Sequence, residues 1–182
     1  IQDNGSGGVE GQYGEGAMIA LRMVQSGVRS VTVSRGGWDT HQGEQDKLTT
    51  RLGSLGTAIT GLITALDALA PISGDPTKTS ALDDVLFVVD SEFSRDNTGP
   101  DGFNGDDGSD HQSTYARYFS AMFAGGGIAG GRAIGATDEA FEPVDGETFH
   151  SSRVNATIYD LLGIDHSKYL AGFSRPIEGL YG

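Results

Sequence analysis

Leucine and isoleucine recur every three or four positions between Glu44 and Leu69, and this spacing places them on one face of a long helix. The face comprises Leu48, Leu52, Leu55, Ile59, Leu62, Leu66 and Leu69. We expect the helix to end before Pro71, because proline cannot continue the hydrogen-bond ladder. We expect its apolar face to be buried against a sheet.

Three further segments have helical patterns. An amphipathic helix is predicted from Gln12 to Ser26, with Gly27 at its C-terminal cap. A second is predicted from His150 to Leu162, ended by Gly163, and a short third one over Ser113–Phe123. Residues 1–11 are polar and glycine-rich, which predicts a flexible or loop segment.

Two β-branched or continuously apolar runs predict strands, at Val28–Ser34 and Asp84–Asp90. Because these strands alternate with helices, we expect an α/β fold with a mixed, mostly parallel sheet flanked by helices. The two strands should be parallel neighbours or near-neighbours.

Each predicted strand leads into a loop that carries reactive side chains. Val28–Ser34 leads to Asp39 and His41, and Asp84–Asp90 leads to Glu92 and Arg95. Ligands of open α/β sheets bind beyond the carboxyl ends of the strands. The placement of these loops therefore indicates a binding site more strongly than any one of their residues.

Each of these residues also has a structural interpretation. Asp39 and His41 can converge on one cation, but Asp39 can equally cap a turn. Glu92, at the end of a buried strand, must be paired, hydrogen-bonded or metal-bound. Arg95 is either its salt-bridge partner or the holder of an anionic substrate group.

A long polar loop ends in the adjacent pair Asp110 and His111. Its many Asp and Asn residues suit calcium, although a solvated acidic loop is the better interpretation and the spacing is not that of an EF-hand. The predicted divalent metal site consists of Asp39, His41, Glu92, Asp110 and His111. Zinc is the first choice for its ion, with manganese and calcium as alternatives.

Composition narrows the classes of partner. The 182 residues carry 25 acidic and 12 basic side chains, a formal net charge of −13, which disfavours binding to nucleic acid or to an anionic membrane surface. No stretch has the roughly 20 apolar residues that span a bilayer. With no cysteine, disulfides and thiolate metal sites are excluded. The polar opening at Ile1, without signal peptide or initiator Met, leads us to expect an incomplete domain.

An ordered set of motifs, SGVRSVTVSRGGWDTH, DVLFVVDSEFSRDN, GSDHQ, GGGIAGGRAIGATD and NATIYDLLGID, resembles one bacterial family. This is the family known as domain of unknown function 1501, which belongs to the alkaline-phosphatase-like superfamily with the sulfatases. The resemblance implies that residues 12–182 form the C-terminal part of one alkaline-phosphatase-like domain. It also implies export to the periplasm or the outside of the cell.

The resemblance assigns metal-ligand roles to residues of three motifs. They are Asp39 and His41 of D-T-H, Glu92 of S-E-F, and the adjacent D-H pair Asp110 and His111. Two positions depart from the family pattern: Ser94 replaces a glycine, and Arg153 stands where an aspartate is usual. We interpret the second change as weakening the edge of the site. The hydroxyl nucleophile of the superfamily belongs to an N-terminal half, so we expect that half of the same gene product as a partner.

Two functions remain open. One is an exported metal-dependent hydrolase of phosphate or sulfate esters, with Arg95 holding an anionic oxygen of the substrate. The other is an exported structural or binding protein that retains the fold without turnover.

Overall fold

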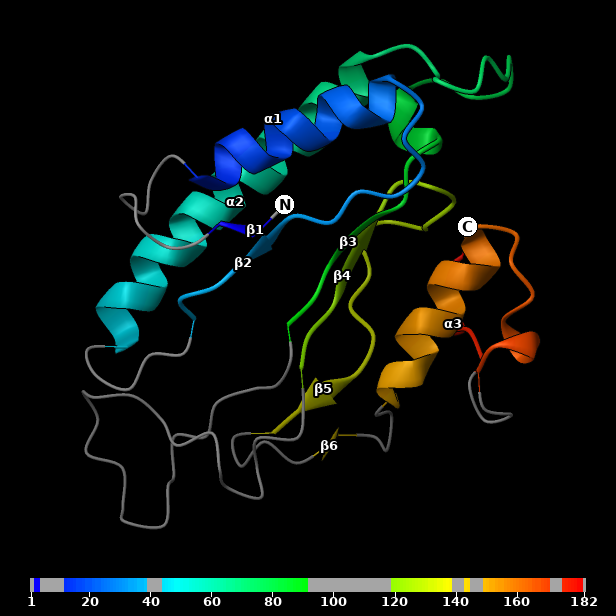
Figure 1. The fold of residues 1–182 in the computed structure, drawn as a ribbon. Coiled ribbons are helices and arrows are strands. Elements are labelled where there is room, and N and C mark those ends of the chain that lie inside the picture. Colours follow the sequence, from blue (N-terminus) through cyan, green and yellow to red (C-terminus); the bar gives the residue numbers. More distant parts are fainter. Residues whose placement is uncertain are drawn as a thin grey trace. The chain divides into compact units, whose positions relative to one another are not determined.

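The structure is a computed structural model that describes residues 2–3, 12–38, 44–91, 119–138, 143–144, 149–170 and 175–181. Helices and short strands alternate along the chain (Figure 1). In order, the elements are β1 (Gln2–Asp3), α1 (Gln12–Gln25), β2 (Ser34–Arg35), α2 (Glu44–Ala68), the 3-10 turn η1 (Ala81–Asp83), β3 (Phe87–Val89), β4 (Met122–Ala124), β5 (Ala136–Thr137), β6 (Pro143–Val144), α3 (Ser151–Leu161) and the 3-10 turn η2 (His166–Lys168). The mixed α/β character expected from the sequence is confirmed. No helix in these ranges is both long enough and apolar enough to cross a membrane.

The chain divides into two compact units. The first unit contains residues 1–81 and 95–116, and the second contains residues 82–94 and 117–182. Each unit has its own buried side chains.

The three long helices agree with the sequence pattern because their ends are set by local chemistry. α1 ends at Gly27, whose φ of 87° is the left-handed conformation that glycine adopts without strain. The amide of Val28 donates to the carbonyl of Met23 at 3.0 Å, which closes the helix end. α3 ends in the same way at Gly163, with a φ of 71°. At its start, the His150 ring accepts a hydrogen bond from the amide of Ser152.

In the first unit, α1 packs along α2 (Figure 1). Leu66 of α2 is 2% exposed and Ala20 of α1 is 7% exposed, so each helix contributes a buried side chain to the first unit. The expectation that the whole leucine face of α2 is buried against a sheet is wrong at Leu52, which is 54% exposed. The described partner of α2 is a helix, and a helix covers a narrower stripe than a sheet does.

The predicted strand Val28–Ser34 is much shorter than expected. Only β2 is a strand, and it pairs in parallel with β1, Gln2 opposite Ser34. Among the described residues, the rest of the segment has no strand beside it, and Val28 and Val33 are 37% and 39% exposed. A β-branched run becomes a strand only where a second strand lies alongside it.

In the second unit, β3 pairs with β4 in antiparallel register, with Val88 opposite Phe123. The expectation of a parallel strand buried on both faces is wrong for the described pairing, since β3 is only half-buried. The predicted helix over Ser113–Phe123 is wrong at its C-terminal end, because Met122–Ala124 forms β4. A mostly parallel sheet is not formed by the described strands, whose pairs are β1–β2, β3–β4 and β5–β6.

Glycines allow close contact between the chain after β4 and the segment that precedes β3. Gly125 and Gly126 have φ values of 68° and 51°. A side chain on Gly125 would overlap the carbonyl oxygens of Leu82 and Val85, and one on Gly126 would lie 2.9 Å from the backbone of Leu86. The glycine-rich segment is thus a close-packing device in this fold.

Candidate functional site

The residues predicted to form the site all lie outside the described residues. They are Asp39, His41, Glu92, Arg95, Asp110 and His111. The structure does describe the residues that lead into two of these loops. Trp38 directly precedes Asp39, and Ser91 directly precedes Glu92.

The approach to the D-T-H loop is held by an aromatic pair. The indole N–H of Trp38 donates to the hydroxyl oxygen of Tyr13 at 2.9 Å, and the two ring centroids are 6.4 Å apart. Tyr13, in the first turn of α1, is 8% exposed. Gly37, with a φ of 89°, turns the chain just before Trp38. The residue before Asp39 is therefore fixed to a buried point of the first unit.

Two arginines gather around this pair. The guanidinium carbon of Arg35 lies 5.0 Å from the centroid of the Tyr13 ring, in a cation–π arrangement. A guanidinium nitrogen of Arg51, from α2, would lie 3.8 Å from a side-chain carbon built on Gly37. Tyr13, Arg35 and Arg51 are called the Tyr13 cluster below. This cluster places two positive charges near the start of the D-T-H loop, in a chain whose formal net charge is −13.

The ionisation of Tyr13 reflects these neighbours. Burial raises the pKa of its hydroxyl above the ordinary value of 10.0, because the phenolate would lose hydration. The Trp38 hydrogen bond and the charges of Arg35 and Arg51 act in the opposite direction.

The approach to the S-E-F loop is the end of β3. Val89 is half-buried and pairs with Met122 of β4, after which Asp90 and Ser91 are exposed. The backbone before β3 is held by the contacts of Gly125 and Gly126 with residues 82–86. Each loop is thus preceded by a short strand, β2 before Trp38 and β3 before Ser91.

Arg153 binds the chain near the C-terminus. Its guanidinium donates to the carbonyl oxygens of Arg175 at 3.1 Å and Pro176 at 2.9 Å, and it lies over the ring of Phe149. The hydroxyl of Thr157, which is fully buried, accepts a hydrogen bond from the amide of Ile177 at 2.9 Å. Arg153, which stands where the resemblance implies an aspartate, therefore has a structural contact in this chain.

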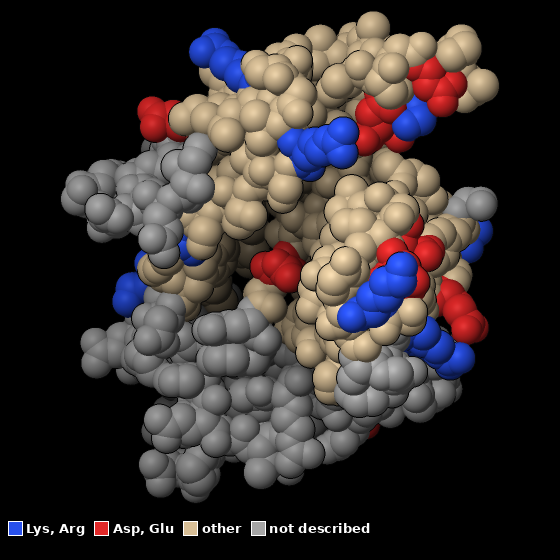
Figure 2. Space-filling model, turned by 45° about the vertical axis from the view of Figure 1, so that its right-hand side comes forward, with Lys and Arg blue, Asp and Glu red and all other residues tan. Residues whose placement is uncertain are grey.

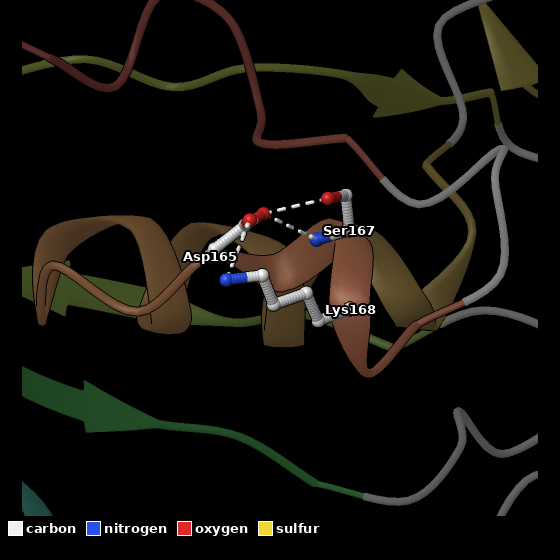
Figure 3. A network of polar contacts seen from close by, with 3 residues as sticks. All are labelled: Asp165, Ser167 and Lys168. Carbon is white, nitrogen blue, oxygen red and sulfur yellow. Dashed lines mark hydrogen bonds and ion pairs between the residues drawn. The ribbon is translucent and has the colours of Figure 1, made fainter.

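Other polar groups near α3 are also structural. Asp165 caps η2: its carboxylate accepts from the amide and hydroxyl of Ser167, at 3.1 and 2.6 Å, and pairs with Lys168 at 3.5 Å (Figure 3). The Ser167 hydroxyl, as the largest cause, lowers the pKa of Asp165. His166 of the same turn is half-buried. No three His, Asp or Glu side chains in the described ranges are grouped so that they could hold a metal.

A shallow groove of about 710 Å³ runs between α1 and α2 in the first unit. Its walls are mainly small or apolar, and Met18 on one wall is 56% exposed. Lining residues on α2 include Gly53, Thr57, Ala58, Gly61 and Ala65.

Charged side chains are scattered over the face in Figure 2, with acidic and basic groups beside one another.

Sequence reasoning missed the Tyr13 cluster. The one signal available was Trp38, the single tryptophan of the chain, placed immediately before the D-T-H motif. Nothing in the spacing shows that Tyr13 contacts this tryptophan or that Arg51 lies near Gly37, because both depend on how the helices pack.

A family model described as "Protein of unknown function (DUF1501)" matches residues 2–179. No curated protein and no solved structure matches the chain.

Proposed function

The chain belongs to the DUF1501 family, and from this premise we propose that it is part of an exported metal-dependent hydrolase of phosphate or sulfate esters. We further propose the alkaline-phosphatase-like fold, of which this chain would be the C-terminal half. The observation that carries the proposal is the position of D-T-H and S-E-F. Each follows a strand end that the structure describes, β2 through the anchored Trp38 and β3 through Ser91.

The donor set fits a divalent ion. The proposed ligands are Asp39, His41, Glu92, Asp110 and His111. Three carboxylates and two imidazoles suit zinc or manganese, and such carboxylates would repel one another without a cation. A bound ion would act as a Lewis acid on the ester oxygens.

The residues of this chain would then bind and orient the substrate. Arg95 would hold an anionic oxygen of the ester through its planar guanidinium. Tyr13 and Trp38 would hold the start of the D-T-H loop so that its ligands keep their position. On the same resemblance, the hydroxyl nucleophile would come from the N-terminal half of the gene product.

Metal content and turnover test this proposal together. The purified gene product, with the N-terminal half that would supply the nucleophile, should contain a divalent metal by elemental analysis and should hydrolyse an aryl phosphate or an aryl sulfate. His41→Ala should lower both, while His166→Ala, which changes a histidine outside the proposed ligand set, should lower neither. Equal losses in the two variants, or no metal in the wild type, would refute the metal site. Metal without turnover would favour the binding protein considered above.

A further inference from the structure

The Tyr13 cluster contains a guanidinium with a buried donor atom that no described group satisfies. The Nη1 atom of Arg51 is shielded from solvent and has no hydrogen-bond partner among the described residues. No ion pair of Arg51 is found in those ranges either. Leaving a buried charged donor unsatisfied is costly, so such a group is normally met by an anion.

The neighbours of Arg51 are suited to the same anion. Arg35 brings a second guanidinium to the Tyr13 ring. The hydroxyl oxygen of Tyr13 accepts the Trp38 N–H, which leaves the hydroxyl's own proton available to donate. Two positive charges and a phenolic donor at one place favour a ligand with several oxygens and a negative charge.

We propose that Arg51, Arg35 and Tyr13 form a binding subsite for a tetrahedral oxyanion, the chemistry shared by phosphate and sulfate. The planar guanidinium of Arg51 supplies paired N–H donors that match such oxygens. Because Trp38 connects the cluster to Asp39, the anion lies beside the root of the D-T-H loop. The assignment of this anion to the substrate's ester group rests on the proposed function, whereas the binding of the free anion does not.

Trp38 is a built-in reporter, because it is the only tryptophan and it contacts Tyr13 directly. Inorganic phosphate and inorganic sulfate should each change its fluorescence in a saturable titration of the full chain. The titration is done after chelation of metals and at constant ionic strength, which removes metal-bound anion and general screening as causes. Phenyl phosphate is then added as a competitor of inorganic phosphate. Displacement of phosphate shows that the subsite accepts an esterified phosphate group, and no displacement shows that it accepts the free anion alone.

The variants assign the effect to the cluster. Arg51→Gln should weaken phosphate binding by about tenfold or more, because hydrogen bonds to charged groups contribute at least that factor. Arg51→Lys should weaken it less. Arg22→Gln, which removes an exposed arginine from the last turn of α1, should leave the affinity within about twofold of wild type.

The melting temperature is a second measurement, and it shows whether a variant is folded. Phosphate should raise the melting temperature of the wild type and of Arg22→Gln, but not that of Arg51→Gln. Absence of saturable binding, or equal affinity in Arg51→Gln and wild type, would overturn the subsite and would indicate an internal counter-ion for Arg51. Because metals are removed, a negative result here leaves the metal and turnover assays of the proposed function to be judged separately.

Discussion

Gly125→Ala is expected to destabilise the second unit strongly, for two separable reasons. The φ of 68° at this position is unfavourable for a residue with a side chain, and costs about 1–2 kcal/mol. The new methyl group would also overlap the carbonyl oxygens of Leu82 and Val85, and overpacking of this kind costs about 1–3 kcal/mol. The free energy of unfolding should therefore fall by about 2–5 kcal/mol, the sum of these two ranges.

Two nearby glycines provide matched controls. Gly131 has a φ of 74° but open space around an added side-chain carbon. Gly131→Ala should therefore carry only the cost of the left-handed conformation, about 1–2 kcal/mol. Gly130 has open space and no left-handed conformation, so Gly130→Ala should be neutral or slightly stabilising.

Urea unfolding followed by far-ultraviolet circular dichroism gives the three free energies of unfolding. Hydrogen exchange of the Gly126 amide, which donates to Leu82 at 3.0 Å, reports on the same place. If Gly125→Ala costs no more than Gly131→Ala, the close contact between this turn and the segment before β3 is wrong.

Three other outcomes follow from burial and hydrogen bonding. Leu66→Ala should cost about 2–5 kcal/mol and Leu52→Ala well under 1 kcal/mol in urea unfolding, because Leu66 is buried and Leu52 exposed; equal costs would contradict the packing of α2. Thr157→Val should reduce stability by about 1–3 kcal/mol and so lower the melting temperature, because the Ile177 amide loses its acceptor; an unchanged melting temperature would show that the hydrogen bond contributes nothing. Burial, with the charge of Asp160 adding to it, raises the pKa of Tyr181 to about 12, so the unfolded chain loses this proton first and stability should fall between about pH 10 and 12. Tyr181→Phe should lessen that fall in alkaline unfolding experiments, and an identical pH profile would argue against the shift.

The helices were predictable because their signals are local. Gly27 and Gly163 end α1 and α3 where the sequence pattern put those ends, since a left-handed cap depends on a few adjacent residues. The strands were less predictable, because pairing joins distant segments. Met122–Ala124 continues a pattern that also suits a helix, and only its pairing with β3 decides for a strand.

The same distinction applies to the candidate site. The sequence predicted a strand before each of the D-T-H and S-E-F loops, and the structure has a short strand before each, β2 and β3. The sequence did not reveal the Tyr13 cluster, because its members come from two helices and a strand. The sequence also could not predict how much of the leucine face of α2 is buried. Leu52 and Leu66 occupy equivalent positions in the helical spacing, but Leu52 is exposed and Leu66 is buried.

The composition of α2 has a consequence for the order of folding. Its 25 residues include Gly53, Gly56 and Gly61 together with several threonines, all poor helix formers. A peptide of this segment alone should be largely unstructured in water, because most of its helical stability must come from packing against α1. The two helices should therefore form as one cooperative foldon, and their amides should exchange with solvent through a common opening event. An alanine at Gly56, where an added carbon meets nothing within 4 Å, would begin to release α2 from that dependence.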